Sequence, residues 1–160
     1  MQIPHNAYVL VADGRKLLFF RNEGDSDYPK LEVEVEREEH NPDARDQGTD
    51  EPGRTFSGAH GGDPRSGGLG ATVGAARSAY SETDFHQLQE DRFAHEAADM
   101  LKQKALANEY DRLIVVAPPK TLGEMRKHYH KEVESRIAGE LAKDLTNMPV
   151  DEIERILQAS

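Results

Sequence analysis

Two apolar runs, residues 8–12 and 16–20, meet near the start of the chain at the dipeptide Asp13-Gly14. A tight turn between antiparallel strands needs a positive φ, and glycine reaches such angles at the lowest cost. The pattern therefore predicts a β-hairpin, and any fold considered for this chain has to contain it.

The next segment alternates between apolar and acidic residues, which is typical of a half-exposed strand. Its apolar and acidic side chains are expected on opposite faces: Leu31, Val33 and Val35 against Glu32, Glu34 and Glu36. A row of carboxylates suits the edge of a sheet, where charge discourages pairing with another chain. The first 39 residues thus predict a three-stranded antiparallel meander.

The composition changes abruptly after this meander. Residues 40–83 contain nine of the 13 glycines of the chain and show neither strand nor helix periodicity. A segment with so few packing residues cannot offset the entropy lost on ordering. We therefore expect a single domain, residues 1–160, that carries a mobile loop at residues 40–83.

Helical spacing of apolar residues begins after Asp84, which we take as the N-cap of a long helix ending near Ala105. Residues 113–117 are apolar throughout, as in a central strand that is buried on both faces. Pro118-Pro119 ends that strand, and a short helix capped by Thr121 is predicted next. A terminal helix follows Asn147, which supplies a cap before an early proline and two acids.

The segment between these two last helices fits two structures. Val133, Ile137 and Leu141 recur at helical spacing, whereas Ile137, Gly139 and Leu141 alternate as in a strand. Glycine weakens a helix interior by about 1 kcal/mol. Periodicity alone leaves helix and strand open here.

Composition bounds the class of protein. The net charge of −10 argues against coating by nucleic acid through a global positive field. The absence of cysteine excludes disulfides, thiolate zinc sites and cysteine nucleophiles.

No signal-peptide pattern and no membrane-length apolar run occurs, so we expect a cytoplasmic protein. No dinucleotide, Walker or nucleophile-elbow motif occurs, and we expect no cofactor and no nucleotide.

Four segments together resemble the bacterial host-attachment protein family: residues 9–15, 52–56, 116–126 and 140–146. The most specific are Ala-Pro-Pro-Lys-Thr-Leu-Gly, at residues 117–123, and Lys-Asp-Leu-Thr, at residues 143–146. The resemblance covers nearly the whole chain. It implies a fold like the central domain of eukaryotic and archaeal release factors and Pelota.

That domain is a ribonuclease-H-like α/β fold. The resemblance implies a mixed five-stranded sheet, in which the three-stranded antiparallel meander is followed by helix, strand, helix, strand and helix. Residues 135–142 are then the fifth strand. Right-handed crossovers place the strand at residues 113–117 beside the first strand.

The resemblance also implies a functional loop. Release factors carry a mobile Gly-Gly-Gln loop between the third strand and the first helix, and this chain has Gly61-Gly62-Asp63 at the matching place. The glutamine is missing, and a carboxylate near tRNA phosphates is repelled unless a cation such as Arg65 pairs with it. Arg54 matches a family motif, and it either binds an anion or ties the loop to a carboxylate of the third strand.

The only dense basic cluster is residues 126–131, and its candidate RNA-binding residues are Arg126, Lys127, His130 and Lys131. Cations interleaved with aromatic rings can contact RNA phosphates and bases. The alternative is a solvated helix face with Tyr129 turned inward. His128 and His130 diverge on a helix, so no metal site is predicted there. Asp13 fits its turn, and we predict no nuclease site.

Three functions remain open. The first is a non-enzymatic binding module that acts on ribosomes or RNA-bearing complexes. The second is a peptidyl-tRNA ester hydrolase that acts through Gly61 and Gly62, and the missing glutamine weighs against it. The third is a regulatory protein, linked to host attachment, that binds another protein through its acidic third strand. Missing export and anchoring signals argue against a direct adhesin, and nothing in the sequence indicates an oligomeric state.

Overall fold

The computed structural model describes the backbone of residues 1–39 and 73–160 and the side chains of residues 1–39 and 84–160. All contacts below lie within one packed unit, Met1–Glu39 with Leu88–Ser160. The elements are β1 (Tyr8–Ala12), β2 (Lys16–Asn22), β3 (Leu31–Glu38), α2 (Val73–Leu106), β4 (Leu113–Val116), α3 (Pro119–Arg126), α4 (Lys131–Glu134), β5 (Ile137–Leu141) and α5 (Val150–Ala159).

The strands form one mixed five-stranded sheet in the order β3-β2-β1-β4-β5. β1 pairs antiparallel with β2 and β2 with β3, whereas β1 pairs parallel with β4 and β4 with β5. The α/β fold class predicted above is confirmed, with the meander first and β4 beside β1. Every residue of β1 and β4 is buried, as their unbroken apolar runs predicted.

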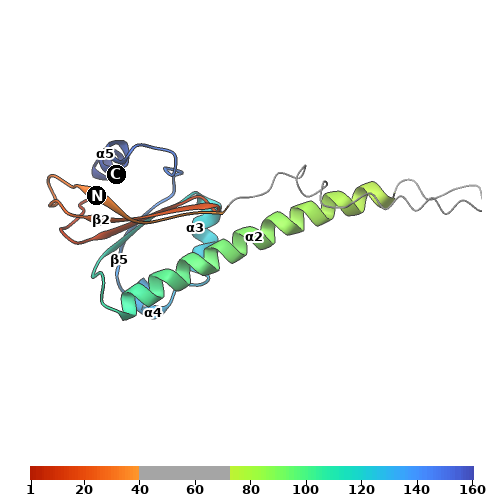
Figure 1. Ribbon diagram of the computed structural model, residues 1–160, viewed down its shortest axis with the longest axis horizontal. Coiled ribbons are helices and arrows are strands. Elements are labelled where there is room, and N and C mark those ends of the chain that lie inside the picture. The colour runs from red at the N-terminus through yellow and green to blue at the C-terminus, as the bar shows by residue number, and fades with distance from the viewer. Residues whose placement is uncertain (40–72) are drawn as a thin grey trace, which may run out of the picture. The chain divides into compact units, whose positions relative to one another are not determined.

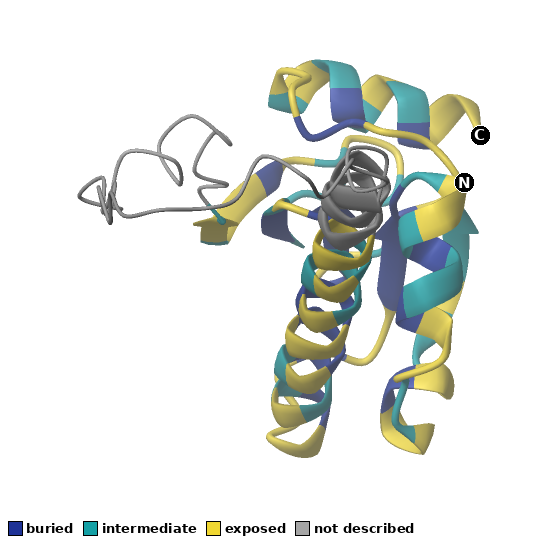
Figure 2. Cartoon of the chain, turned by 90° about the vertical axis from the view of Figure 1, so that its right-hand side faces the viewer, coloured by how far each residue is buried: buried dark blue, intermediate teal, exposed yellow. Residues whose placement is uncertain are grey.

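Helices cover both faces of the sheet, and each face has its own core. In Figure 1, α5 lies on one side of the sheet while α2, α3 and α4 lie on the other. Figure 2 shows the packed part of α2 with buried residues along one side only. Several of these are alanines (Ala94, Ala97, Ala98 and Ala105), whose small side chains let the helix lie close to the strands.

The hairpin between β1 and β2 is built as predicted. Gly14 has a φ of +95°, and the carboxylate of Asp13 accepts hydrogen bonds from the N–H groups of Arg15 (2.9 Å) and Lys16 (2.7 Å). An aspartate side chain that bonds the backbone two and three residues on is a common way to fix a turn.

The predicted alternation of β3 is broken by a bulge. The register shifts between Phe19 and Phe20, so that Phe19 lies opposite Val35 and Phe20 opposite Val33. An extra residue moves side chains to the other face of a strand. Leu31 therefore packs in the core under α5, whereas Val35 packs in the core under α2, and the expectation of one apolar face was wrong.

Three helix starts also differ from the prediction. α2 begins at Val73, so residues 73–83 are helical and Asp84 lies inside the helix. Thr121 is likewise inside α3, whose N-cap is Pro118, and the N-cap of α5 is Pro149 and not Asn147. In α3 and α5 a proline precedes the helix, and no capping side chain bonds the first turn. The expected mobility of residues 40–72 lies outside the described residues.

Residues 137–141 form β5, which settles the choice between helix and strand in favour of the strand. Among the described residues, no helix is apolar enough over a sufficient length to cross a bilayer.

Candidate functional site at the carboxyl edge of the sheet

The three parallel strands β1, β4 and β5 end at the same edge of the sheet, which we call the carboxyl edge. Each runs directly into one of the segments that carry the family resemblance, residues 9–15, 116–126 and 140–146. In open α/β sheets, ligands bind in the crevice beyond the carboxyl ends of the strands. Three motifs far apart in the sequence are thus brought together where such a fold places its sites.

The hydroxyl of Thr146 joins two of these segments. Its Oγ1 lies 2.9 Å from Oδ2 of Asp13 and 2.8 Å from Oδ1 of Asp144, and the side chain of Thr146 is buried. The N–H of Thr146 also donates to Oδ1 of Asp144 (3.2 Å). A hydroxyl has a single proton, so it serves one carboxylate at a time. The contact ties the β1–β2 turn to the segment after β5.

The same turn lies close to α2 and α3. A side chain at Gly14 would place its Cβ 3.5 Å from Oγ1 of Thr121 and 3.9 Å from Cγ of Glu90. Nζ of Lys120 lies 2.5 Å from Oε2 of Glu90, and this carboxylate raises the pKa of the lysine. The lysine of the Ala-Pro-Pro-Lys-Thr-Leu-Gly segment therefore binds an acid of α2 at this edge.

The end of β3 lies beside the same edge. The N–H of Glu39, the last residue described before residue 73, donates to the carbonyl of Arg15 in the β1–β2 turn (2.8 Å). Arg54, Gly61, Gly62, Asp63 and Arg65, the predicted loop residues, lie outside the described residues.

The structure pairs much of the predicted basic cluster with acids. Arg126 binds Glu140 of β5, with Nε 3.0 Å from Oε2, and Lys127 binds Glu124 at 2.9 Å. Nδ1 of His130 accepts a hydrogen bond from the N–H of Glu132 and so caps α4.

Lys131 is exposed on α4, and the ring of Tyr129 packs against the core under α2. The four candidate residues therefore lie near one another, at α3, at α4 and in the turn between them. Nearby carboxylates compensate much of their charge.

A polar cleft at the opposite edge, where β1 and β4 begin, gave no signal in the sequence analysis. It encloses about 410 Å³ and is lined by Arg21, Arg112 and eight further residues. Asn6 and Asn108, which also line it, have positive φ angles of 61° and 55°. Asparagine tolerates this region better than most residues, so Asn108, two residues after the end of α2, is a clue that the sequence analysis did not use.

The fold defines a class: an α/β protein with a mixed five-stranded sheet, whose candidate site lies at the carboxyl ends of β1, β4 and β5. The chain belongs to bacterial archaeo-eukaryotic release factor family 12, whose model matches residues 6–157. The predicted likeness to release factors is thereby confirmed, and it supports a translation-related role at the family level. The matched family does not carry the host-attachment name, and that role stays a prediction. No curated protein matches the chain.

Proposed function

We propose that the protein is a non-enzymatic binding module of the translation apparatus, which contacts a ribosome or a tRNA-bearing complex through its carboxyl edge and the segment at residues 40–72. Family membership supports the translation-related part. The observation that carries the rest is the meeting of the three motif segments at one edge, through the pairing of β1, β4 and β5 and the Thr146–Asp13 hydrogen bond. Proteins of one fold can have different functions, so the function has to be inferred from the site. Here the motif segments lie at the candidate site.

A binding role fits the loop sequence better than hydrolysis. Gly61-Gly62 is followed by aspartate where release factors have glutamine. An ionised carboxylate has no hydrogen-bond donor, whereas the amide of glutamine has two, so Asp63 cannot replace the glutamine. Ester hydrolysis through this loop is the alternative, and a peptide-release assay separates the two.

Co-sedimentation with ribosomes on a gradient, at low and at moderate salt, tests the proposal. The full chain is compared with a variant that lacks residues 57–70 and with the charge reversal Lys120→Glu at the carboxyl edge. Arg155→Glu is the matched control, because Arg155 is similarly exposed (71% against 62% for Lys120) and is also paired with a glutamate, but on α5.

We expect the deletion and Lys120→Glu to lower the ribosomal fraction several-fold and Arg155→Glu to leave it unchanged. Full-length protein that stays at the top of the gradient at both salts contradicts the proposal. Equal loss with both reversals shows attraction by charge alone and contradicts the assignment to the carboxyl edge. Peptide release by the full chain that Gly62→Ala abolishes supports the hydrolase instead.

A further inference from the structure

The outer side of β3 is an unpaired strand edge. β3 is the first strand in the sheet order, and within the described residues no strand pairs with its outer side. The N–H of Glu39 donates to Arg15 on the β2 side, so the alternation of a strand turns the main-chain groups of Glu38 and Glu36 outward. Such groups are a template for a further strand.

The other end of β3 is already covered. The N–H of Leu31 donates to Oε1 of Glu154 on α5 at 2.6 Å. The rest of the edge runs from Val33 to Glu38, with the bulge at its Val33 end, and Val33 exposes 48% of its surface. This length suits an extended peptide of about six residues, since one strand residue rises about 3.3 Å.

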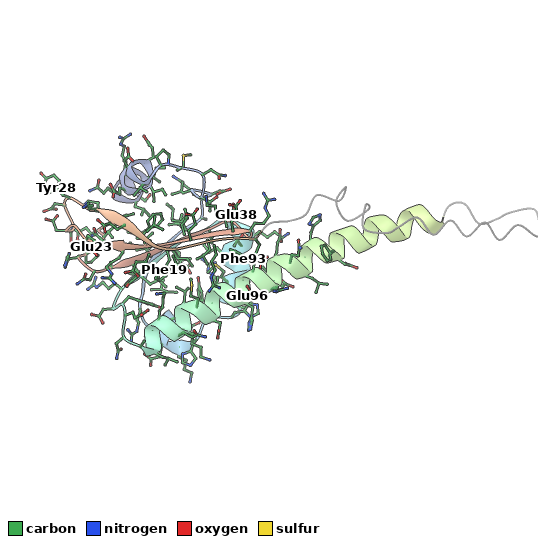
Figure 3. All side chains as sticks on the ribbon, in the orientation of Figure 1. Phe19, Glu23, Tyr28, Glu38, Phe93 and Glu96 are labelled. Atoms are coloured by element: carbon green, nitrogen blue, oxygen red, sulfur yellow. The ribbon has the colours of Figure 1, made fainter. Side chains whose placement is uncertain are left out.

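A groove runs beside this edge, between β3 and α2. It consists of two adjoining hollows, the larger about 210 Å³, and Arg37, Glu96 and Met100 line both. Leu17 and Phe93 add apolar surface to the smaller hollow. Figure 3 labels Glu38 at the end of β3, with Phe93 and Glu96 on α2. An edge strand beside a helix, with a partly apolar groove between them, can take the alternate side chains of an added strand.

The charge of β3 and its surroundings indicates which kind of peptide can bind there. Residues 32–39 contain five glutamates and one arginine. Lys16, Arg21 and Lys30 pair with three of these carboxylates, whereas no ion pair within 4.0 Å is recorded for Glu38 or Glu39 in the described part of the chain. The excess of negative charge favours lysine and arginine on a partner and repels an acidic chain or a nucleic acid.

We propose that β3 and the groove beside α2 form a docking surface for an extended basic peptide of another protein, which adds a strand to the outer side of β3. The main-chain hydrogen bonds of the added strand supply affinity. Its cations bind the β3 carboxylates, and its apolar side chains enter the groove around Met100, whose flexible side chain adapts to different shapes. The surface adjoins the carboxyl edge at Glu39, but the proposal does not depend on the role proposed for that edge.

Fluorescence anisotropy with a labelled heptapeptide of alternating lysine and valine tests this surface. Two further peptides serve as controls: one with glutamate in place of lysine, and one with the lysine sequence but methylated backbone nitrogens. Methylation keeps charge and side chains but removes the donors that strand addition needs. We expect binding of the first peptide only.

Two variants at Glu36 separate the backbone from the charge. Glu36→Pro removes both the carboxylate and the outward N–H, and proline is tolerated on edge strands. Glu36→Ala removes the carboxylate alone. We expect Glu36→Ala to weaken binding about threefold, as for an exposed charge pair, and Glu36→Pro to weaken it at least about tenfold. Circular dichroism checks that both variants are folded.

Equal binding of the methylated peptide overturns the proposal, and this test decides the matter even if Glu36→Pro does not fold. Equal binding of the glutamate peptide overturns the charge selection. Concentration-dependent dimers that Glu36→Pro abolishes would assign the edge to a second copy of the chain. Binding of the lysine peptide only after residues 57–70 are deleted would assign it to the chain's own segment. Either result contradicts the proposal that the partner is a peptide of another protein.

Discussion

Two tyrosine hydroxyls are buried under α2, and they differ in what they contact. The hydroxyl of Tyr110 donates to the carbonyl of Leu101 at 2.8 Å. The hydroxyl of Tyr129 has no hydrogen-bond partner among the residues that the structure describes. Removing a hydroxyl that is bonded leaves its partner unsatisfied, whereas removing an unbonded one costs no such bond. Replacement by phenylalanine is therefore expected to destabilise the protein at Tyr110 but not at Tyr129.

Tyr110→Phe should lower the free energy of unfolding by about 1 kcal/mol at neutral pH, because the carbonyl of Leu101 loses its donor. Tyr129→Phe should leave the free energy unchanged or raise it. Urea unfolding of the two variants and the unchanged protein measures both. A loss at Tyr129 as large as that at Tyr110 would contradict the contacts described for these hydroxyls.

Burial also makes stability depend on pH. It raises the pKa of both phenols above the usual value of 10.0, because it disfavours the charged phenolate. Above the unfolded pKa, the unfolded chain has released these protons while the folded protein still holds them. Their contribution is complete below pH 10 and is lost as pH rises toward the raised folded pKa. The double variant Tyr110→Phe, Tyr129→Phe should lose less stability than the unchanged protein between about pH 8 and about pH 11. An equal loss would show that other groups cause the alkaline decline.

At the carboxyl edge, the hydrogen bonds of the Thr146 hydroxyl can be tested by substitution. Thr146→Val keeps the shape of the side chain but removes the hydroxyl that bridges Asp13 and Asp144, so we expect a loss of about 1.5–3 kcal/mol, as for a hydrogen bond to a charged group. Thr146→Ser keeps the hydroxyl and should lose less. Thermal unfolding of both variants measures this difference. Equal losses would mean that the methyl group, and not the hydroxyl, stabilises this edge.

At the scale of elements, the sequence predicted what unbroken patterns can encode. The apolar runs around Asp13-Gly14 predicted β1 and β2, and residues 113–117 predicted β4. The bulge in β3 was not predictable, because it is set by the pairing of Phe19 and Phe20 with their neighbours. The start of α2 was missed because residues 73–83 lack apolar periodicity, although alanines there favour a helix.

The candidate site was predictable only in part. The family segments pointed to residues 9–15, 116–126 and 140–146, and the turn role of Asp13 was correct. The bond between Asp13 and Thr146 joins residues 133 positions apart, and no local pattern encodes such a contact. β5 also needed the resemblance, because Ile137 and Leu141 fit a helix and a strand equally well.

The stability that a leucine of α2 contributes should depend on whether its side chain faces the sheet. Leu101 is fully buried, whereas Leu106 on the same helix exposes 56% of its surface. Leu101→Ala should cost about 2–5 kcal/mol because it removes buried methyl groups and leaves a cavity, while Leu106→Ala should change stability by less than about 0.5 kcal/mol. Chemical denaturation of both variants measures the contrast. Similar losses would mean that α2 does not pack on the sheet through the side that carries Leu101.

At the scale of the whole molecule, charge decides which contacts with RNA are available. The net charge is −10. Two neighbouring cations at the end of α3 are paired with carboxylates, Arg126 with Glu140 and Lys127 with Glu124. Non-specific RNA binding comes from cations that neutralise phosphates and release counterions. A protein with this distribution of charge is expected to recognise a defined complex and not RNA in general.

The unchanged protein should therefore not retain unfractionated tRNA in a filter-binding assay at about 0.15 M salt. The double variant Glu124→Gln, Glu140→Gln frees Lys127 and Arg126, and it should gain weak binding that declines as salt rises. Glu96→Gln with Glu152→Gln is the control, because it raises the net charge equally but frees Arg92 and Arg155 on two separate helices. Gain in the first variant alone would show that the carboxylates of α3 and β5 suppress an RNA-binding cluster. Retention of tRNA by the unchanged protein would contradict the argument from charge.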